Sequence, residues 1–260
     1  MDTEHLTLDI LVSTVAHKLG SIHEMLLPQR DGVRYVISAQ YATAQPPVLP
    51  PELSSRSDVT VGFLPGMGLS RNRNNAIALA SADICVVADD DNRYLPEHID
   101  TIIDTWRENP DADIITFQAE TYEGDPLHPY PAPYVCSQEI TFRLSSINGK
   151  GIRFDERFGL GSPLLCAGEE DVLIYDARKA GLAVRYIPKV IVRTDRFTTG
   201  TRFLSDKKVQ ITKGATFRYI YGTASAVWRS FKEAGWYLFH KGANPFPILH
   251  NMLKGIWILR

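Results

Sequence analysis

The sequence predicts an α/β fold in which an open sheet is flanked by helices, and two observations lead to this prediction. Short apolar runs with strand character alternate along the first 195 residues with segments whose apolar residues recur at helical spacing. The chain has 260 residues, of which 44% are hydrophobic and 22% are charged, an ordinary globular composition. This length suits one large α/β domain with an appendage.

Five strands are predicted in the first half of the chain, because five apolar runs are bounded by polar, Gly or Pro residues. They cover residues 6–17, 34–41, 58–65, 83–91 and 112–120. Since the intervening segments are mostly helical, we expect the strands to run parallel. In such sheets ligands bind outside the carboxyl ends of the strands, where the strand order reverses.

Helices are predicted at 21–30, 68–82 and 95–109. The last of these has Pro96 at its start and an apolar face that includes Ile99, Ile103 and Trp106. Between the second and third strands, residues 43–55 contain four prolines, which favours a loop or an extended linker.

The second half of the chain is expected to begin with a loop, because residues 122–135 are rich in Pro and Tyr. A helix follows over 169–179, with Gly181 as its natural C-cap, and then another strand. Residues 196–260 are predicted to form a mainly helical, aromatic and basic extension. We therefore divide the chain into a domain of 1–195, with a donor half of about 1–120 and an acceptor half of about 121–195, and the extension 196–260.

Charge is unevenly distributed, although the net charge is only −2. Residues 196–260 hold eleven Lys and Arg against two acids, a net of +9, so the rest carries −2 − 9 = −11. No basic and aromatic nucleic-acid motif accompanies the basic region, so no nucleic-acid partner is expected.

The three cysteines are widely spaced, which favours reduced thiols. The chain lacks a signal pattern and an 18-residue apolar run, so we expect a cytoplasmic protein.

Three adjacent carboxylates, Asp89, Asp90 and Asp91, follow the apolar run 84–88. Adjacent anions repel by roughly 4 kcal/mol per close pair at an effective dielectric near 20. Two interpretations remain open. The triplet can be an acidic turn before a helix, or it can bind a divalent cation such as Mg²⁺ or Mn²⁺ that also neutralises a diphosphate.

The segment 68–92 resembles the signature of family 2 glycosyltransferases, which have the GT-A fold, a Rossmann-like open mixed sheet flanked by helices. The residues that carry the resemblance are Gly68, Ser70, Arg73-Asn74, the strand 84–87 and the aspartate triplet. A second segment, 154–181, resembles the acceptor side of the same family. The resemblance covers roughly residues 7–192 and implies a metal held by Asp91 together with Asp89.

The resemblance also implies a nucleotide-sugar donor, a UDP-sugar in most cases, with a dTDP-sugar or another donor as alternatives. Gln40 stands where the family usually has an Asp that contacts uracil, and its amide can bond a pyrimidine edge. The other residues expected at the donor are Thr14, Ser70, Arg73, Asn74, Asp89 and Asp90.

A second acidic cluster, Glu169-Glu170-Asp171, follows Gly168 at the start of a predicted helix. The resemblance implies that it supplies the catalytic base. Alignment from Gly168 to Gly181 places the base at Glu170, whereas alignment on the Glu-Asp pair places it at Asp171. The alternative is ordinary acidic capping of a helix N-terminus, which favours Asp and Glu.

The basic extension has apolar residues at helical spacing from Phe217 to Phe231, flanked by Arg218, Arg229 and Lys232. Three interpretations are open: residues 214–260 contact a membrane surface, pack on the domain core, or form an interface with another subunit.

We therefore expect an inverting, metal-dependent hexosyltransferase that moves a sugar from a nucleotide-diphosphate donor to a hydroxyl of a glycan or lipid-linked acceptor. The family resemblance implies a role in bacterial surface-polysaccharide synthesis, at the inner face of the cell membrane if the extension binds lipid. One alternative is a nucleotidyltransferase that makes nucleotide-sugars, although residues 13–21 are poor in the glycines such enzymes use. The other is a non-catalytic membrane-associated scaffold.

Overall fold

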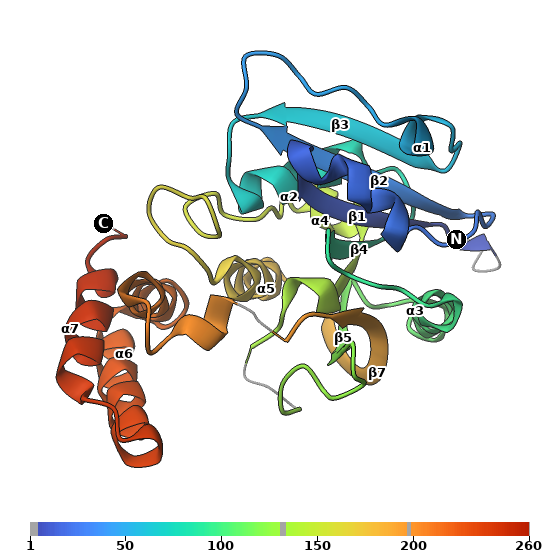
Figure 1. The fold of residues 1–260 in the computed structure, drawn as a ribbon. Helices are drawn as coiled ribbons and strands as arrows, with labels where there is room; N and C mark the ends of the chain where they lie inside the picture. Colours follow the sequence, from blue (N-terminus) through green and yellow to red (C-terminus); the bar gives the residue numbers. More distant parts are fainter. Residues whose placement is uncertain (1–4, 131–133, 197–198, 260) are drawn as a thin grey trace. The chain divides into compact units, whose positions relative to one another are not determined.

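The computed structural model describes residues 5–130, 134–196 and 199–259, and the remaining residues of the predicted domain and extension lie outside this description. The chain divides into two compact units (Figure 1). Unit 1 comprises Met1–Met67, Arg71–Arg153 and Asp176–Arg196, and unit 2 comprises Gly68–Ser70, Phe154–Tyr175 and Phe197–Arg260. Residues 154–175 thus cluster with the C-terminal region, whereas the predicted division into donor and acceptor halves remains a prediction.

Unit 1 is built on a seven-stranded mixed sheet with the order β3-β2-β1-β4-β6-β5-β7. The strands are β1 (Leu8–Val15), β2 (Val33–Tyr41), β3 (Val59–Pro65), β4 (Ile84–Asp89), β5 (Ile114–Thr121), β6 (Ile140–Arg143) and β7 (Val184–Thr194). All six predicted strands are confirmed. The sequence did not reveal β6, a short strand that runs antiparallel to both β4 and β5 and makes the sheet mixed.

The central strands are buried on both faces, which explains their nearly continuous apolar sequences. One face packs against η2 (Ala16–Met25) and α3 (Pro96–Glu108), whose buried residues join the main core with Ile10, Ile37 and Val86. On the opposite face, α2 (Leu69–Leu79) is tied to β2 through hydrogen bonds to Ser38. The sheet is thus covered on both sides, as its sequence predicts.

The helices predicted in 68–82 and 95–109 are confirmed, and the one predicted over 169–179 is α5 (Glu169–Lys179). Two expectations need correction. The helix expected in 21–30 is a 3₁₀ helix that begins at Ala16 and ends at Met25. The Pro-rich segment also contains a single helical turn, α1 (Pro51–Ser54), because prolines are tolerated at the first positions of a helix. The shorter remaining elements are η3 (Ser137–Glu139), α4 (Leu144–Gly149) and η4 (Thr199–Arg202).

Unit 2 contains the long segment α6 (Lys207–Lys241) and α7 (Pro245–Ile256). The chain reverses inside α6 at Gly222, whose φ of 76° and ψ of 170° are not helical. In a straight helix Val209 and Ala234 would lie about 37 Å apart, yet they share one hydrophobic cluster with Met252 of α7. The rings of Phe203 and Tyr237 also stack at 4.6 Å. The extension is therefore a bundle of three helical segments, 207–221, 223–241 and 245–256.

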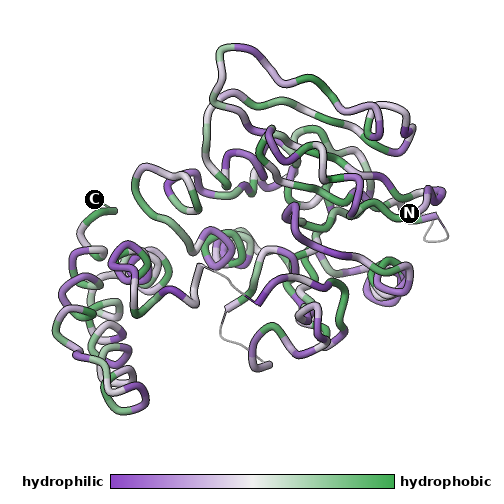
Figure 2. Tube along the Cα trace, viewed as in Figure 1, coloured by the Kyte–Doolittle hydropathy of each residue, from purple (hydrophilic) through white to green (hydrophobic). Residues whose placement is uncertain are grey.

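The bundle is closely packed because small residues line its contacts. A Cβ atom on Gly214 would lie 1.9 Å from the backbone oxygen of Met252, and one on Gly255 would lie 1.9 Å from that of Ile211. In the segment 223–241 the buried residues are Ala226, Ser230 and Ala234. Figure 2 shows hydrophobic and hydrophilic residues mixed along α6 and α7. No helix among the described residues is long and apolar enough to cross a membrane.

We predict that Gly214→Ala destabilises this bundle, because the added methyl group cannot avoid the backbone of α7. Overpacking of this kind costs about 1–3 kcal/mol of unfolding free energy, and thermal unfolding followed by circular dichroism measures it. Gly235→Ala is the matched control. Its Cβ meets nothing within 4 Å, so the variant should gain about 0.5–1 kcal/mol from reduced backbone entropy. Equal midpoints for both variants would contradict the packing described here.

Candidate functional site

The aspartate triplet lies where the strand order of the sheet reverses. The chain runs from β1 outward through β2 to β3 and then returns to the other side of β1 as β4. The register pairs Ser13 of β1 with Asp89 of β4, and Val15 of β1 with Gln40 of β2. Thr14, Gln40 and Asp89 are therefore brought to the same carboxyl edge, as the sequence predicts. Ser13 Oγ is buried there and has no hydrogen-bond partner among the described residues.

Asp89 is held by a buried cation. Arg73, only 3% exposed, donates from Nη2 to Asp89 Oδ1 at 3.1 Å and to Ser137 Oγ at 2.7 Å. The Ser137 hydroxyl in turn donates to Asp89 Oδ2 at 3.2 Å. The structure thus places the predicted Arg73 next to Asp89, where its charge offsets part of the repulsion within the triplet.

Asp90 is held by Thr14, near the end of β1, and by Lys18 on η2. Thr14 Oγ1 donates to Asp90 Oδ2 at 2.8 Å, and the Lys18 ammonium lies 2.7 Å from Asp90 Oδ1. This hydrogen bond raises the pKa of Lys18 against the opposing effect of burial, and the charges of all three aspartates add to the rise. Lys18 could not be recognised from the sequence, because a single basic residue after the first strand is a weak signal; in the structure it lies on η2.

Asp91 is the carboxylate of the triplet that remains open to solvent. Its side chain accepts a long hydrogen bond, 3.4 Å, from Asn92 Nδ2 and another from its own backbone amide. Desolvation by the surrounding chain raises the pKa of Asp91, and the nearby charges of Asp89 and Asp90 raise it further. A carboxylate that is exposed and crowded by like charges suits a divalent cation such as Mg²⁺ or Mn²⁺.

The loop that carries Asp91 is fixed by Asn92, which is fully buried. Asn92 Oδ1 accepts from the Asp89 amide at 2.9 Å, and its Nδ2 donates to Thr194 Oγ1 at 3.2 Å. Asn92 therefore closes the turn at the end of β4 rather than starting a helix, since α3 begins only at Pro96.

The polar start of α2 is attached to the same edge of the sheet. Asn72 Nδ2 donates to the carbonyl oxygen of Thr14 at 3.0 Å, and its Oδ1 accepts from Ser38 Oγ at 2.7 Å. Asn75 Nδ2 donates to Ser38 Oγ at 2.7 Å. Of the predicted residues on this helix, Arg73 is buried and Asn74 is half-buried. The asparagines hold α2 in register with the strands that end at the site.

Ser70, predicted as a donor contact, belongs to unit 2. It is 1% exposed, and its hydroxyl donates to the carbonyl oxygen of Phe158 at 2.6 Å. A Cβ atom on Gly159 would lie 2.8 Å from Ser70 Oγ and 3.3 Å from Glu169 Cδ, so these three residues converge. Within unit 2, Ser70 connects the start of α2 to the segment that precedes α5.

The second acidic cluster occupies the first turn of α5, directly after Gly168 with its positive φ of 83°. Glu169 is 4% exposed, whereas Glu170 and Asp171 are partly exposed. Burial raises the pKa of Asp171 to about 6; Lys213 counteracts this rise and Glu169 adds to it. Both predicted base residues, Glu170 and Asp171, lie in unit 2, whereas the triplet lies in unit 1.

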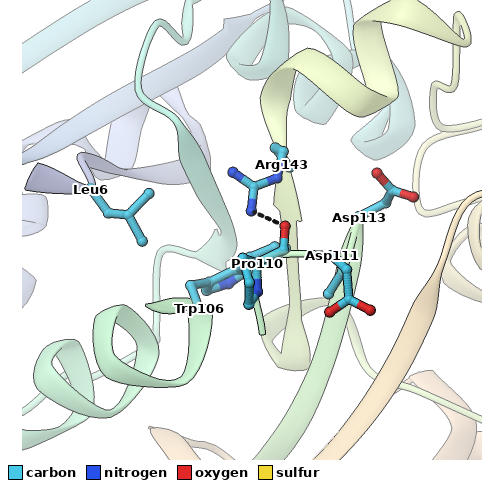
Figure 3. A pocket seen from close by; sticks show the side chains of 7 residues that line it. Leu6, Trp106, Pro110, Asp111, Asp113 and Arg143 are labelled. Carbon is cyan, nitrogen blue, oxygen red and sulfur yellow. Dashed lines mark hydrogen bonds between the residues drawn. The ribbon is translucent and has the colours of Figure 1, made fainter. Parts of the chain in front are cut away.

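A separate pocket of about 430 Å³ lies at the opposite, amino-terminal end of the parallel strands (Figure 3). It is lined by residues that include Leu6, Trp106, Asp113 and Arg143. Arg143 packs over the Trp106 ring at 5.3 Å and donates to the carbonyl oxygen of Pro110 at 3.3 Å. This pocket contains none of the predicted site residues.

Part of the chain matches a known protein family. Residues 50–161 match the family model described as Glycosyl transferase family 2. The matched range includes α2, β4 and the triplet. No curated protein sequence matches the chain.

Among solved structures, S. aureus TarS 1-349 has a TM-score of 0.58 at 12% sequence identity, over 96% of this chain and 90% of that chain. Its complex with UDP-GlcNAc has a TM-score of 0.56 at 13% identity, over 90% and 73% of the two chains. The present chain spans only 44% of the longer TarS chain. The mannosyltransferase PcManGT from Pyrobaculum calidifontis, in complex with GDP-Man and Mn²⁺, has a TM-score of 0.53 at 13% identity, over 97% and 70%.

The match covers the strand, helix and carboxylates that form the reversal point of the sheet, and the likeness to the solved structures extends over most of the chain. Residues 50–161 thus match glycosyl transferase family 2, and the chain has the GT-A fold.

Proposed function

We propose that the protein transfers a sugar from a nucleotide-diphosphate donor to an acceptor hydroxyl, with inversion at the anomeric carbon. The observation that carries this proposal is the aspartate triplet at the strand-order reversal, in which Asp89 and Asp90 are neutralised while Asp91 stays open. Relatives of the same fold were solved with UDP-GlcNAc, UDP, and GDP-Man with Mn²⁺, which supports a donor of this class.

On the donor side, Asp91 with Asp89 would hold Mg²⁺ or Mn²⁺, and the bound cation would neutralise the charge of the leaving diphosphate. The amide of Gln40, at the end of β2, would bond the base. The ammonium of Lys18 lies in the same site on Asp90 and can also contact the diphosphate. Thr14, Arg73 and Asn74 would complete the donor site, whereas the buried Ser70 hydroxyl, bonded to Phe158, is left out of it.

On the acceptor side, a carboxylate of α5 would take the proton of the attacking hydroxyl as the new bond to C1 forms and the bond from C1 to the diphosphate breaks. A base works best when its pKa lies near the operating pH. The pKa of about 6 supports Asp171, whereas the spacing from Gly168 to Gly181 supports Glu170. Both residues therefore enter the experiment.

The acceptor we propose is a glycan or lipid-linked saccharide of a bacterial surface polysaccharide, reached from the membrane surface. This part of the proposal rests on α6, where the helical segment 223–241 points its small residues inward and its bulky residues outward. Trp228 is 70% exposed, Phe231 52% and Phe239 84%. Phe246, at the start of α7, is 77% exposed. These four rings are thus not part of a core, although Ala215 of the extension shares a hydrophobic cluster with Phe158 and Val172.

These four residues, named here the aromatic surface, are accompanied by cations. Lys232 lies at helical spacing beside Trp228, and the Arg229 guanidinium lies 3.6 Å from the centroid of the Tyr221 ring. Rings that enter the headgroup region and cations that attract anionic lipids together favour a membrane interface, and each basic residue adds about 1 kcal/mol near an anionic surface.

We predict that the natural chain slowly hydrolyses a nucleotide-sugar when Mn²⁺ is present, in a panel of UDP-, dTDP- and GDP-sugars, with release of the nucleoside diphosphate. Asp91→Asn should lower this rate by at least about 100-fold, because cation stabilisation of the leaving group is worth several kcal/mol. When no metal is added to either protein, Asp91→Asn should unfold at a higher temperature than the natural chain. The reason is that a carboxylate with a raised pKa, such as Asp91, destabilises the fold when it is charged at neutral pH.

Asp104→Asn is the control for this experiment, because Asp104 is an exposed residue of α3 that pairs with Arg107; it should change neither the rate nor the metal response. Release of pyrophosphate from a nucleoside triphosphate and a sugar phosphate would instead establish a nucleotidyltransferase. Absence of metal-dependent nucleotide binding would leave only the scaffold alternative.

We predict that Asp171→Asn changes stability in a pH-dependent manner. The folded state holds the Asp171 proton more tightly than the unfolded state, whose pKa is 3.8, so ionisation destabilises the fold as pH rises from 3.8 to about 6, and the loss persists above that. The variant should therefore be more stable than the natural chain at about pH 8 and indistinguishable from it below about pH 4. If Asp171 is the base, the transfer rate also falls by about 10²–10⁴-fold. Full activity in Asp171→Asn together with a loss of this size in Glu170→Gln would assign the base to Glu170.

We predict that the natural chain sediments with vesicles that contain phosphatidylglycerol and less with vesicles of phosphatidylcholine alone. The double variant Trp228→Ser with Phe239→Ser should weaken this binding at least about tenfold, since a fully buried aromatic side chain contributes roughly 1.5–3 kcal/mol. Val48→Ser is the control, because Val48 is 90% exposed in unit 1. Unchanged vesicle binding, with a dimer in light scattering that the double variant dissociates, would show that the aromatic surface is a subunit interface.

A further inference from the structure

Three side chains with metal-binding atoms lie close together in the segment that connects β5 to β6 along the chain. They form a cluster separate from the aspartate triplet. They are His128, Cys136 and Glu139, and their ligand atoms all lie within 4.8 Å of one another. All three belong to unit 1. The sequence drew no attention to them, because their spacing matches no common zinc motif.

The cluster is well buried. His128 is 7% exposed and Glu139 is 1% exposed, and His128 Nε2 lies 3.0 Å from Glu139 Oε1 and 3.2 Å from Oε2. Tetrahedral zinc has bonds of about 2.0–2.3 Å to nitrogen, oxygen and sulfur, so that neighbouring ligand atoms lie roughly 3.3–3.7 Å apart. The imidazole and the carboxylate are thus almost at the spacing of zinc ligands, and the sulfur, within 4.8 Å of both, needs to move by at most about 1 Å.

We propose that His128, Cys136 and Glu139 bind a Zn²⁺ ion, with a water molecule in the fourth position. Imidazole nitrogen and thiolate sulfur favour zinc, whereas Mg²⁺ and Mn²⁺ prefer the all-oxygen carboxylates of the triplet. Binding displaces the Cys136 thiol proton and the proton that His128 shares with Glu139, and no oxidation or reduction is involved. Cys136 is not part of a disulfide.

The surrounding hydrogen bonds orient the carboxylate for this role. Glu139 Oε2 accepts from the Cys136 amide at 2.8 Å, while Oε1 accepts from the Tyr130 hydroxyl and from the Ala119 amide. Such outer bonds fix ligands in established metal sites. The bond to the Cys136 amide also holds the cysteine and the glutamate on one turn of η3.

The ion would stabilise a segment that reaches the donor site. Ser137, which lies between two of the proposed ligands, contacts both Arg73 and Asp89. By joining His128 to η3, zinc would hold the backbone of Ser137 in this position. The inference does not depend on the proposed transfer reaction, because metal binding is measured directly.

The test is a titration of the metal-stripped, reduced full chain with Co²⁺, which reports a cysteine ligand through thiolate-to-cobalt absorption in the near ultraviolet. We expect this absorption to saturate at one equivalent and to disappear when Zn²⁺ is added. Zinc should also raise the midpoint of thermal unfolding. Absence of the thiolate absorption in the natural chain would overturn the proposal, because the cluster would then be only a hydrogen-bonded network.

Variants assign the ligands. Cys136→Ser should abolish the absorption, whereas Cys166→Ser and Cys85→Ala should retain it, and His128→Gln should keep the band but weaken Co²⁺ binding at least tenfold, within the range of about 10–100-fold found when metal sites are perturbed. Asp91→Asn should retain the site in full, which separates it from the triplet and keeps its failure distinct from a failure of the proposed transferase. Survival of the band in Cys136→Ser would contradict the assignment.

Discussion

The ion pair between Arg73 and Asp89 is the interaction on which the candidate site depends. A guanidinium that is 3% exposed needs an anion beside it, and Asp89, at the end of β4, supplies one at 3.1 Å. Each group therefore stabilises the other. Ser137, which bonds to both, attaches the mixed half of the sheet to the parallel half at this point.

The neighbouring charges give each of the three aspartates a different environment. Arg73 neutralises Asp89 and Lys18 neutralises Asp90, so the repulsion that remains is concentrated on Asp91. A cation at Asp91 would relieve that repulsion, and this is the physical reason why a chain keeps three adjacent carboxylates at the end of a strand. In unit 2, burial is likewise the main cause of the raised pKa of Asp171 on α5, as it is for Asp91.

The C-terminal bundle has an apolar core that leaves several large rings outside. Val209, Ile248 and Met252 lie in that core, and Gly214 and Gly255 allow the closest backbone approach, whereas Trp228 and Phe239 are exposed. Close backbone packing lets the three helical segments form a stable bundle without these rings. The exposed rings can therefore contact a partner molecule, and the flanking cations favour a partner with anionic groups.

Sequence alone determined the strands β1 to β5 and β7, the helices α2, α3 and α5, and the position of the triplet at a strand end, because each depends on periodicity or capping within a few residues. Tertiary structure decided what depends on partners far along the chain. The antiparallel strand β6 exists through its pairing with β4 and β5, and the reversal at Gly222 is defined by the contact of Val209 with the Ala234 cluster. Lys18 gained a role only through Asp90, 72 residues away, and His128 only through Glu139. Local preferences specify elements, but hydrogen bonds and charges between distant residues select which side chains meet.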